Sequence, residues 1–311
     1  MAAGMSSAVV AQNYPAKPIR FIVPWPAGGV ADITTRLVAR KLGENMGQTF
    51  VVDNRAGATG IIGCELAARA VPDGYTLLMG TTTTHATNPV MFKKLPYDSI
   101  KDFAPISLVA DAPFVLLVHP SLPVKNVKAL IALAKTRPGQ LTYGSSGTGG
   151  SSHLGFELFN QMAGIKAVHV PYKGLAPATI DLLAGNITMS WESTAAATPY
   201  IRDKRLRALG IGSAKRSTLM PDIPTISESG LTGFELGSWS AMFAPAATPP
   251  DIVRRVQREV VVAINDRSMR EQLAALGAEP VGSTSEELAA VLRNDVVKWT
   301  KIARQANLQP E

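Results

Sequence analysis

The stretch from residue 19 to residue 42, IRFIVPWPAGGVADITTRLVARKL, changes from one apolar pattern to another. Residues 19–23 form a β-prone apolar run, which Pro24 stops. A loop rich in Pro and Gly follows. Apolar side chains then recur at helical spacing, at Ile33, Leu37, Val38 and Leu42. The stretch therefore predicts a strand, a tight loop and an amphipathic helix.

The same alternation continues along the chain. Residues 50–52 and 75–79 have strand patterns, and residues 61–70 between them have a helical one. A second series follows residue 125. It has helices near 126–135, 153–163 and 177–184, and strands at 141–143, 167–170, 187–190 and 206–210. Nearly continuous apolar strands separated by helices indicate parallel sheets buried on both faces.

Two places interrupt the alternation. The β runs 103–109 and 114–118 lie too close together for a helix between them, and the run 239–244 precedes two long helices. We interpret these places as crossings between two lobes. The sequence thus predicts an α/β protein with two lobes, each a mostly parallel sheet flanked by helices. Residues 13–112 plus 238–311 form the first lobe, and residues 113–237 the second.

Composition excludes several classes of protein. The chain has 311 residues and a net charge of +7, but its Lys and Arg residues are scattered and no nucleic-acid-binding motif accompanies them. No apolar run approaches the roughly 20 residues that span a bilayer. We expect no binding to nucleic acid, and any work at a membrane must go through a partner protein. The single cysteine, Cys64, cannot form an intramolecular disulfide and is predicted to be a core residue.

The first twelve residues suggest export. Ser7 to Ala11 end in small side chains of the kind that a signal peptidase recognises, although the basic segment and most of the apolar segment of a signal are missing. We interpret residues 1–12 as a remnant of a secretion signal. A disordered tail is the alternative.

Several loops that follow a strand and open a helix are rich in Gly and hydroxyl residues. The main ones are residues 24–29 with Asp32, residues 81–85 with Asn88, and residues 145–153; residues 172–174 and 192–194 are lesser ones. The first N–H groups of a helix lack intrahelical partners and attract anions. Such loops lie beyond the carboxyl ends of parallel strands, where α/β proteins bind ligands. Each loop alone has a simpler interpretation as a turn or a helix cap.

Signs of catalysis are weak. The G-x-S-x-G pattern fails because Thr148 takes its last position, and the four histidines have no metal-ligand spacing. No nucleotide-binding loop is present. We expect no metal and no cofactor. A hydrolase or isomerase with Ser146 or Ser152 as nucleophile and His153 as base is the alternative that the residues leave open.

These loops also carry a family resemblance. The chain resembles the Bug-type extracytoplasmic receptors, which are the substrate-binding subunits of tripartite tricarboxylate transporters. The matching stretches are residues 14–15 with 18–19, 24–32, 54–58 with Gly60, 72–78, 84–86 with 88–89, 95–98, 101–105, 144–154, 170–174 with Pro177, and Pro221 with 224–225. The resemblance spans nearly the whole chain from Tyr14 onward.

The resemblance implies a two-lobe, type II-like periplasmic binding protein that is no enzyme, is a monomer, and closes around a small mono- or dicarboxylate. Membrane transporter subunits are the implied partners, and an accessory or sensor protein is an alternative role. The implied ligand-binding residues are Ala27, Gly28, Asp32, Thr83, Thr84, His85 and Asn88 in the first lobe and Ser146, Gly147, Thr148, Ser152, His153, Gly174, Glu192 and Ser193 in the second. Two further candidates are Gly29 and Trp25.

Two positions depart from the family pattern. Trp25 replaces the more usual Phe and would offer a stacking face to an aromatic ligand. Glu192 stands where many relatives have Asp, and a second ligand carboxylate near it would be repelled. With Asp32 accepting from a ligand hydroxyl or amine, the loop 146–152 would hold the carboxylate.

Overall fold

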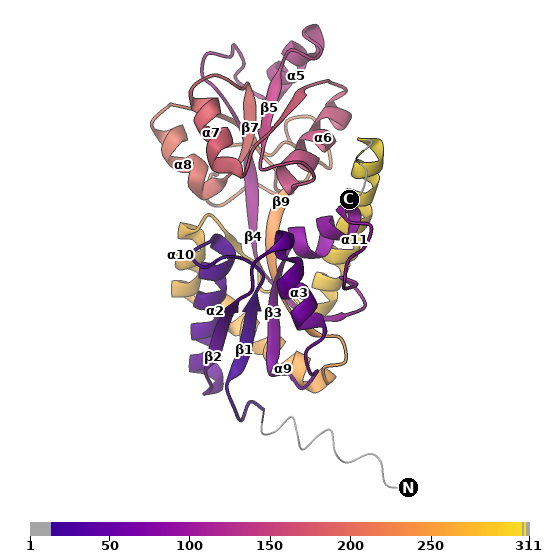
Figure 1. Cartoon of the computed structure of the whole chain (residues 1–311). Coiled ribbons are helices and arrows are strands. Elements are labelled where there is room, and N and C mark those ends of the chain that lie inside the picture. Colours follow the sequence, from indigo (N-terminus) through magenta and orange to yellow (C-terminus); the bar gives the residue numbers. More distant parts are fainter. Residues whose placement is uncertain (1–13, 307, 309–311) are drawn as a thin grey trace.

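The computed structural model of the chain describes residues 14–306 and residue 308. It is an α/β structure with two lobes, joined by long strands that run from one to the other (Figure 1). The predicted α/β class is therefore confirmed, but both sheets are mixed rather than mostly parallel, because the long joining strands pair antiparallel with their neighbours. The predicted signal remnant, residues 1–12, lies outside the described residues. Among those residues, no helix has the length and apolar character needed to cross a bilayer.

The first lobe has a mixed sheet. Its strand order is β10-β4-β9-β3-β1-β2, in which β1, β2 and β3 are parallel and β9 runs antiparallel to both β3 and β4. The bounds are β1 (Ile19–Val23), β2 (Phe50–Asn54), β3 (Thr76–Thr81), β4 (Phe103–Val118), β9 (Gly237–Pro245) and β10 (Glu279–Pro280). The apolar runs predicted as parallel strands form β1, β2 and β3, so their carboxyl ends share one edge of the sheet.

The second lobe repeats the arrangement on a smaller scale. Strands β5 (Thr142–Ser145), β6 (Val168–Pro171) and β7 (Met189–Ser193) are parallel. The far end of β4 pairs antiparallel with β7 on one side and with β8 (Arg207–Ile211) on the other. Helices α5 (Val127–Thr136), α6 (Ser151–Ala163), α7 (Leu175–Leu183) and α8 (Thr194–Arg202) flank this sheet.

Strand β4 belongs to both lobes. The sequence predicts two separate strands here, but the structure has one continuous strand of 16 residues. Residues 103–113 pair with β9, and residues 114–118 pair with β7 and β8. Pro113 does not interrupt the strand. A proline has no N–H to donate to a neighbouring strand, and it is tolerated here because the pairing partner changes at this point. The lobe boundaries at 112/113 and 237/238 remain our proposal, which this change of partner supports.

The remaining helices cover both faces of the first sheet. Helices α2, α9 and α10 pack on one face, around a cluster that includes Val38, Val256 and Met269. Helices α3, α4 and α11 lie on the other face, where Cys64 is fully buried as predicted. The bounds are α2 (Val30–Met46), η1 (Ala58–Gly60), α3 (Ile61–Ala68), η2 (Thr83–Thr87), α4 (Asn88–Met91), α9 (Pro250–Asn265), α10 (Arg267–Ala275) and α11 (Ser285–Gln305).

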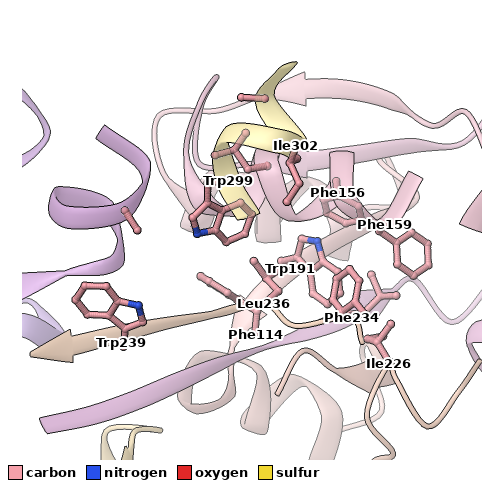
Figure 2. Packing of buried hydrophobic residues seen from close by; sticks show 14 of the residues in the cluster. Phe114, Phe156, Phe159, Trp191, Ile226, Phe234, Leu236, Trp239, Trp299 and Ile302 are labelled. Carbon is pink, nitrogen blue, oxygen red and sulfur yellow. The ribbon is translucent and has the colours of Figure 1, made fainter. Parts of the chain in front are cut away.

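Helix α11 reaches from the first lobe to the second. Its apolar stripe begins on β4 and ends at Trp299 and Ile302, which lie in one cluster with Phe156 of α6 and Trp191 of β7. Figure 2 shows Trp299 and Ile302 beside these second-lobe side chains. The last helix therefore packs on both lobes, next to the strands that join them.

An acidic group lies where β4 leaves the first lobe. Asp111 of β4 is directly opposite Trp239 of β9 and Glu279 of β10, so the three side chains share a face. On that face, Trp239 Nε1 donates to Asp295 of α11 at 2.8 Å. Burial raises the pKa of Asp111 to about 6, and the nearby carboxylates of Glu279 and Asp295 add to the increase.

Replacement of this carboxyl group should stabilise the protein in a pH-dependent way. Because the pKa of Asp111 is raised in the folded state, the native protein loses stability as the pH rises through about 6. We expect Asp111→Asn to raise the free energy of unfolding by up to about 3 kcal/mol at pH 8. At pH 4 the gain should nearly disappear.

Denaturant titrations at pH 4, 6 and 8 check this expectation. The exposed Asp222 of the second lobe supplies the control variant, Asp222→Asn, which should show no such trend. A loss of stability in Asp111→Asn at pH 8 would mean that the carboxylate makes a favourable interaction there.

Candidate functional site

A cavity of about 420 Å³ lies at the carboxyl ends of β1 and β3, where the first lobe meets the second. The loop after β1 and the start of α2 form one wall, with Trp25, Pro26, Gly29, Val30, Ala31 and Thr34. The crossing strands form another, with Ala110, Ala112 and Phe114 of β4 and Ser238 and Ser240 of β9. Thr81, Thr83, Ala278 and the second-lobe residue Ser193 complete it. The size is typical of a site for a small molecule.

The wall from the crossing strands results from side-chain alternation. Successive residues of a strand point to opposite faces of the sheet. Ala110 and Ala112 therefore face the cavity, whereas Asp111 between them faces the other side. Ser238 and Ser240 alternate with Trp239 in the same way. Small side chains on one face of the two strands leave the space that the cavity occupies.

Asp32 fixes the loop that opens α2. Its carboxylate accepts from the backbone N–H of Gly28 at 2.9 Å, from Arg36 at 3.0 Å and from Asn54 at 2.9 Å. Burial alone raises the pKa of Asp32, but these hydrogen bonds outweigh it and hold the pKa below its ordinary value. Asn54 also donates to the carbonyl of Trp25 at 3.0 Å. All these contacts lie within the first lobe, so the carboxylate braces the loop.

The start of α2 is open to an anion. Its N-cap is Gly29, which offers no side-chain hydrogen bond to the first turn. Gly28 has a φ of +83°, which a residue with a side chain would adopt only with strain. The first-turn residues Val30 and Ala31 line the cavity. Unpaired N–H groups at the start of a 17-residue helix therefore lie beside this space.

The loop after β3 mostly packs inward. Thr83 lines the cavity, but Thr84 bonds to Thr81 and to His85 Nδ1 and is fully buried. His85 stacks on Phe243 with ring centroids 4.1 Å apart, and burial lowers its pKa to about 3. Asn88 is buried too, and donates to the carbonyl of Thr59 at 3.0 Å. Three of these four candidates are thus buried by their own packing and hydrogen bonds, and none of the three lines the cavity.

The second-lobe loop between β5 and α6 is held by its own polar groups. Ser152 Oγ accepts from the backbone N–H of Ser146 at 2.9 Å and lies 3.0 Å from Ser146 Oγ. His153 Nδ1 accepts from the N–H of Gly149 at 3.0 Å, and its ring stacks on His169 with centroids 3.8 Å apart. Burial lowers the pKa of His153 to about 4. Gly147 and Thr148 lie at the tip of the loop.

This arrangement bears on the hydrolase alternative. Ser152 bonds to Ser146 rather than to a histidine, and His153 accepts from a backbone N–H. The serine–histidine pair that does form joins Ser145 Oγ to His169 Nε2 at 2.6 Å, and Ser145 is fully buried. The predicted nucleophiles and base are therefore not arranged as a catalytic pair in this conformation.

The other second-lobe candidates have separate roles. Glu192 is buried and accepts from Thr179 Oγ1 at 2.7 Å and from the N–H of Ser193 at 2.8 Å. Ser193 caps α8 and also lines the cavity. Gly174 is the N-cap of α7 and donates its N–H to the carbonyl of Ser146.

Three helix starts in the candidate loops lack a side-chain cap. Helices α2, α6 and α7 begin at Gly29, Gly150 and Gly174, and none of these starts has a side-chain cap. Side-chain oxygens cap α5, α8 and α10, from Asn126, Ser193 and Asp266, and α3 and α9 have no such cap either. Three helices from the two lobes thus retain unpaired N–H groups, which is the arrangement that anions bind. The described part of the chain contains no cluster of His, Cys, Asp and Glu suited to a metal ion.

The sequence comparison agrees with this geometry. The family model described as "Tripartite tricarboxylate transporter family receptor" matches residues 34–308. The chain belongs to this receptor family. Protein BugT of Bordetella pertussis is 38% identical to it over 304 residues, which cover 97% of this chain and 93% of BugT. The predicted resemblance to Bug-type receptors is confirmed.

Solved structures of relatives have the same fold. An R. palustris protein with adipate shares 36% identity, with a TM-score of 0.81, and the match covers 96% of this chain and 100% of that one. MatC from Rhodopseudomonas palustris with bound malate shares 29% identity, with a TM-score of 0.75, covering 93% and 99% of the two chains. Members of this receptor family are periplasmic solute-binding proteins.

The cavity brings together only part of the predicted set. Of the candidates, Trp25, Gly29, Thr83 and Ser193 line it. Ala27 and Gly28 lie in the exposed loop beside it, and the contacts predicted for the remaining candidates stay predictions. Sequence reasoning missed the wall from β4 and β9. The signal was small residues at every second position, Ala110-Asp111-Ala112 and Ser238-Trp239-Ser240.

The role of Asp32 in stabilising the loop before α2 can be tested by mutation. Asp32→Ala removes a buried carboxylate, so Gly28, Arg36 and Asn54 each lose the hydrogen bond that they donate to it. We expect a loss of about 2 kcal/mol in the free energy of unfolding. Asp222→Ala, at an exposed position, should cost little. Denaturant unfolding at pH 7 measures both variants, and equal stabilities would contradict the bracing role.

Proposed function

We propose that this chain is an extracytoplasmic solute receptor that binds a small mono- or dicarboxylate between its two lobes. The observation that carries the proposal is the cavity where the lobes meet, next to the uncapped start of α2. Relatives solved with adipate and with malate support a carboxylate as the ligand. In this proposal the chain works in the periplasm as a monomer and delivers its ligand to the membrane subunits of a tripartite tricarboxylate transporter.

The binding mechanism needs no cationic clamp. The N–H groups of the first turn of α2 would hold the carboxylate, and hydroxyls such as Thr83 and Ser193 would bond to its oxygens. Ser193 belongs to the second lobe and Thr83 to the first, so a ligand between them would favour the closed form. The loop 146–148 and the start of α6 would add contacts from the second lobe as the cleft closes.

Thermal unfolding in the presence of small carboxylates tests the proposal. A ligand at a hundred times its dissociation constant stabilises the native state by about 2.7 kcal/mol. We expect a selective and saturable increase in melting temperature, with the ligand recovered unchanged. Turnover of an ester panel that disappears in Ser146→Ala would favour the hydrolase instead. If aliphatic and aromatic acids all leave the melting temperature unchanged, the receptor proposal fails.

A variant that fills the cavity should abolish binding. Ala112 lines the cavity on β4, so Ala112→Leu would occupy the space where the ligand lies. We expect the affinity for any carboxylate hit to fall at least tenfold. Ala247→Leu, at an exposed turn, is the matched control and should bind like the unmodified protein. Isothermal titration calorimetry measures both, and unchanged affinity in Ala112→Leu would place the site elsewhere.

A further inference from the structure

The chemistry of the cavity wall restricts the ligand further. In the described part of the chain, no residue that lines the cavity carries a charge. Its polar side-chain groups are the indole N–H of Trp25, which is buried without a hydrogen-bond partner, and the hydroxyls of Thr34, Thr81, Thr83, Ser193, Ser238 and Ser240. A carboxylate that loses its water shell needs strong donors or a cation. The open N–H groups at the start of α2 meet this need for one carboxylate.

Apart from the indole N–H of Trp25, the rest of the wall is apolar, and it includes two aromatic rings. Trp25 comes from the loop after β1 in the first lobe, and Phe114 comes from the second-lobe part of β4. Both positions are held firmly. The carbonyl of Trp25 accepts from Asn54 at 3.0 Å, and Phe114 is paired with Ser193 in the sheet. The side chains of Ala110 and Ala112 are small, so they leave space in the cavity beside these rings.

The two rings come from opposite lobes and line the same cavity. Aromatic side chains favour offset-stacked or edge-to-face contacts with another ring. A flat apolar ligand between Trp25 and Phe114 would touch both lobes, and its burial would favour closure. A flexible aliphatic chain would contact the same walls without the ring geometry, and its second carboxylate would meet hydroxyls but no cation.

We propose that the cavity selects an aromatic monocarboxylate of the benzoate class, with its carboxylate at the start of α2 and its ring between Trp25 and Phe114. This inference rests on the proposed receptor function. The hydroxyls of Ser238 and Ser240 on the β9 wall would accommodate a ring hydroxyl. Trp25 and Phe114 are then the residues that determine specificity for the ring.

Calorimetric titrations with benzoate, cyclohexanecarboxylate and adipate test the selection. Benzoate and cyclohexanecarboxylate have the same number of carbons and one carboxylate, so their comparison isolates the aromatic ring. We expect benzoate to bind about 3- to 10-fold more tightly than cyclohexanecarboxylate. Adipate should bind at least tenfold more weakly than benzoate, because its second carboxylate is desolvated without a cation.

Variants show which side chains carry the preference. Trp25→Leu and Phe114→Leu should each reduce the preference for benzoate over cyclohexanecarboxylate, whereas Trp25→Phe, which keeps a ring, should retain most of it. Tyr200→Leu removes an aromatic side chain on α8 away from the cavity and is the control. The melting temperature of each ligand-free variant establishes that it is folded.

The outcomes separate the two proposals. Tighter binding of adipate than of benzoate, with affinity lost in Ala112→Leu, would overturn the aromatic selection and leave the receptor function in place. A preference for benzoate that persists in both leucine variants would also overturn it. Failure of all three acids to bind would overturn this inference and count against the receptor itself.

Discussion

The alternation of side chains along the crossing strands β4 and β9 is the constraint on which the rest of the structure depends. One face of these strands carries alanines and serines, and the other carries Asp111 and Trp239. The first face leaves the cavity open. On the second face, Trp239 Nε1 donates a hydrogen bond to Asp295 of α11. Because the side-chain period of a strand is two, a shift of register by one residue would put Trp239 into the cavity and remove the anchor of α11.

Helix α11 links the cavity wall to the joint between the lobes. It bonds to β9 through Asp295, while Trp299 and Ile302 lie four and seven residues further on, in a cluster with second-lobe aromatic side chains. Positions 295, 299 and 302 fall on one side of a helix. A rotation of one lobe relative to the other must therefore rearrange these side-chain contacts as well as bend the strands that join the lobes. The part of the joint around Trp299 and Ile302 is apolar, so closure of the cleft would have to keep or rearrange this cluster.

Local signals made much of the fold predictable. The apolar runs and helical spacing of residues 19–42 gave β1 and α2, and the Gly-rich loops correctly marked uncapped helix starts such as Gly29. The cavity itself was not predictable in the same way. Ala110 and Ser238 become neighbouring parts of a wall only through strand pairing across more than 120 residues. His85 follows a strand like the other candidates, but the π-helical turn at 83–87 buries it against Phe243. No periodicity in the sequence distinguishes a loop residue that lines the cavity from one that is buried in the core.

The electrostatics at the start of α2 explain how an acid can stand beside the proposed anion site. Asp32 lies in the first turn, where its negative charge would repel a ligand carboxylate and compete for the helix dipole. Arg36 neutralises that charge at 3.0 Å, and Asn54 and the N–H of Gly28 satisfy the remaining lone pairs. The carboxylate thus turns away from the cavity and rigidifies the loop that carries Trp25. Its backbone donor, Gly28, precedes the helix, so Asp32 orders the loop while the N–H groups of the first turn remain available.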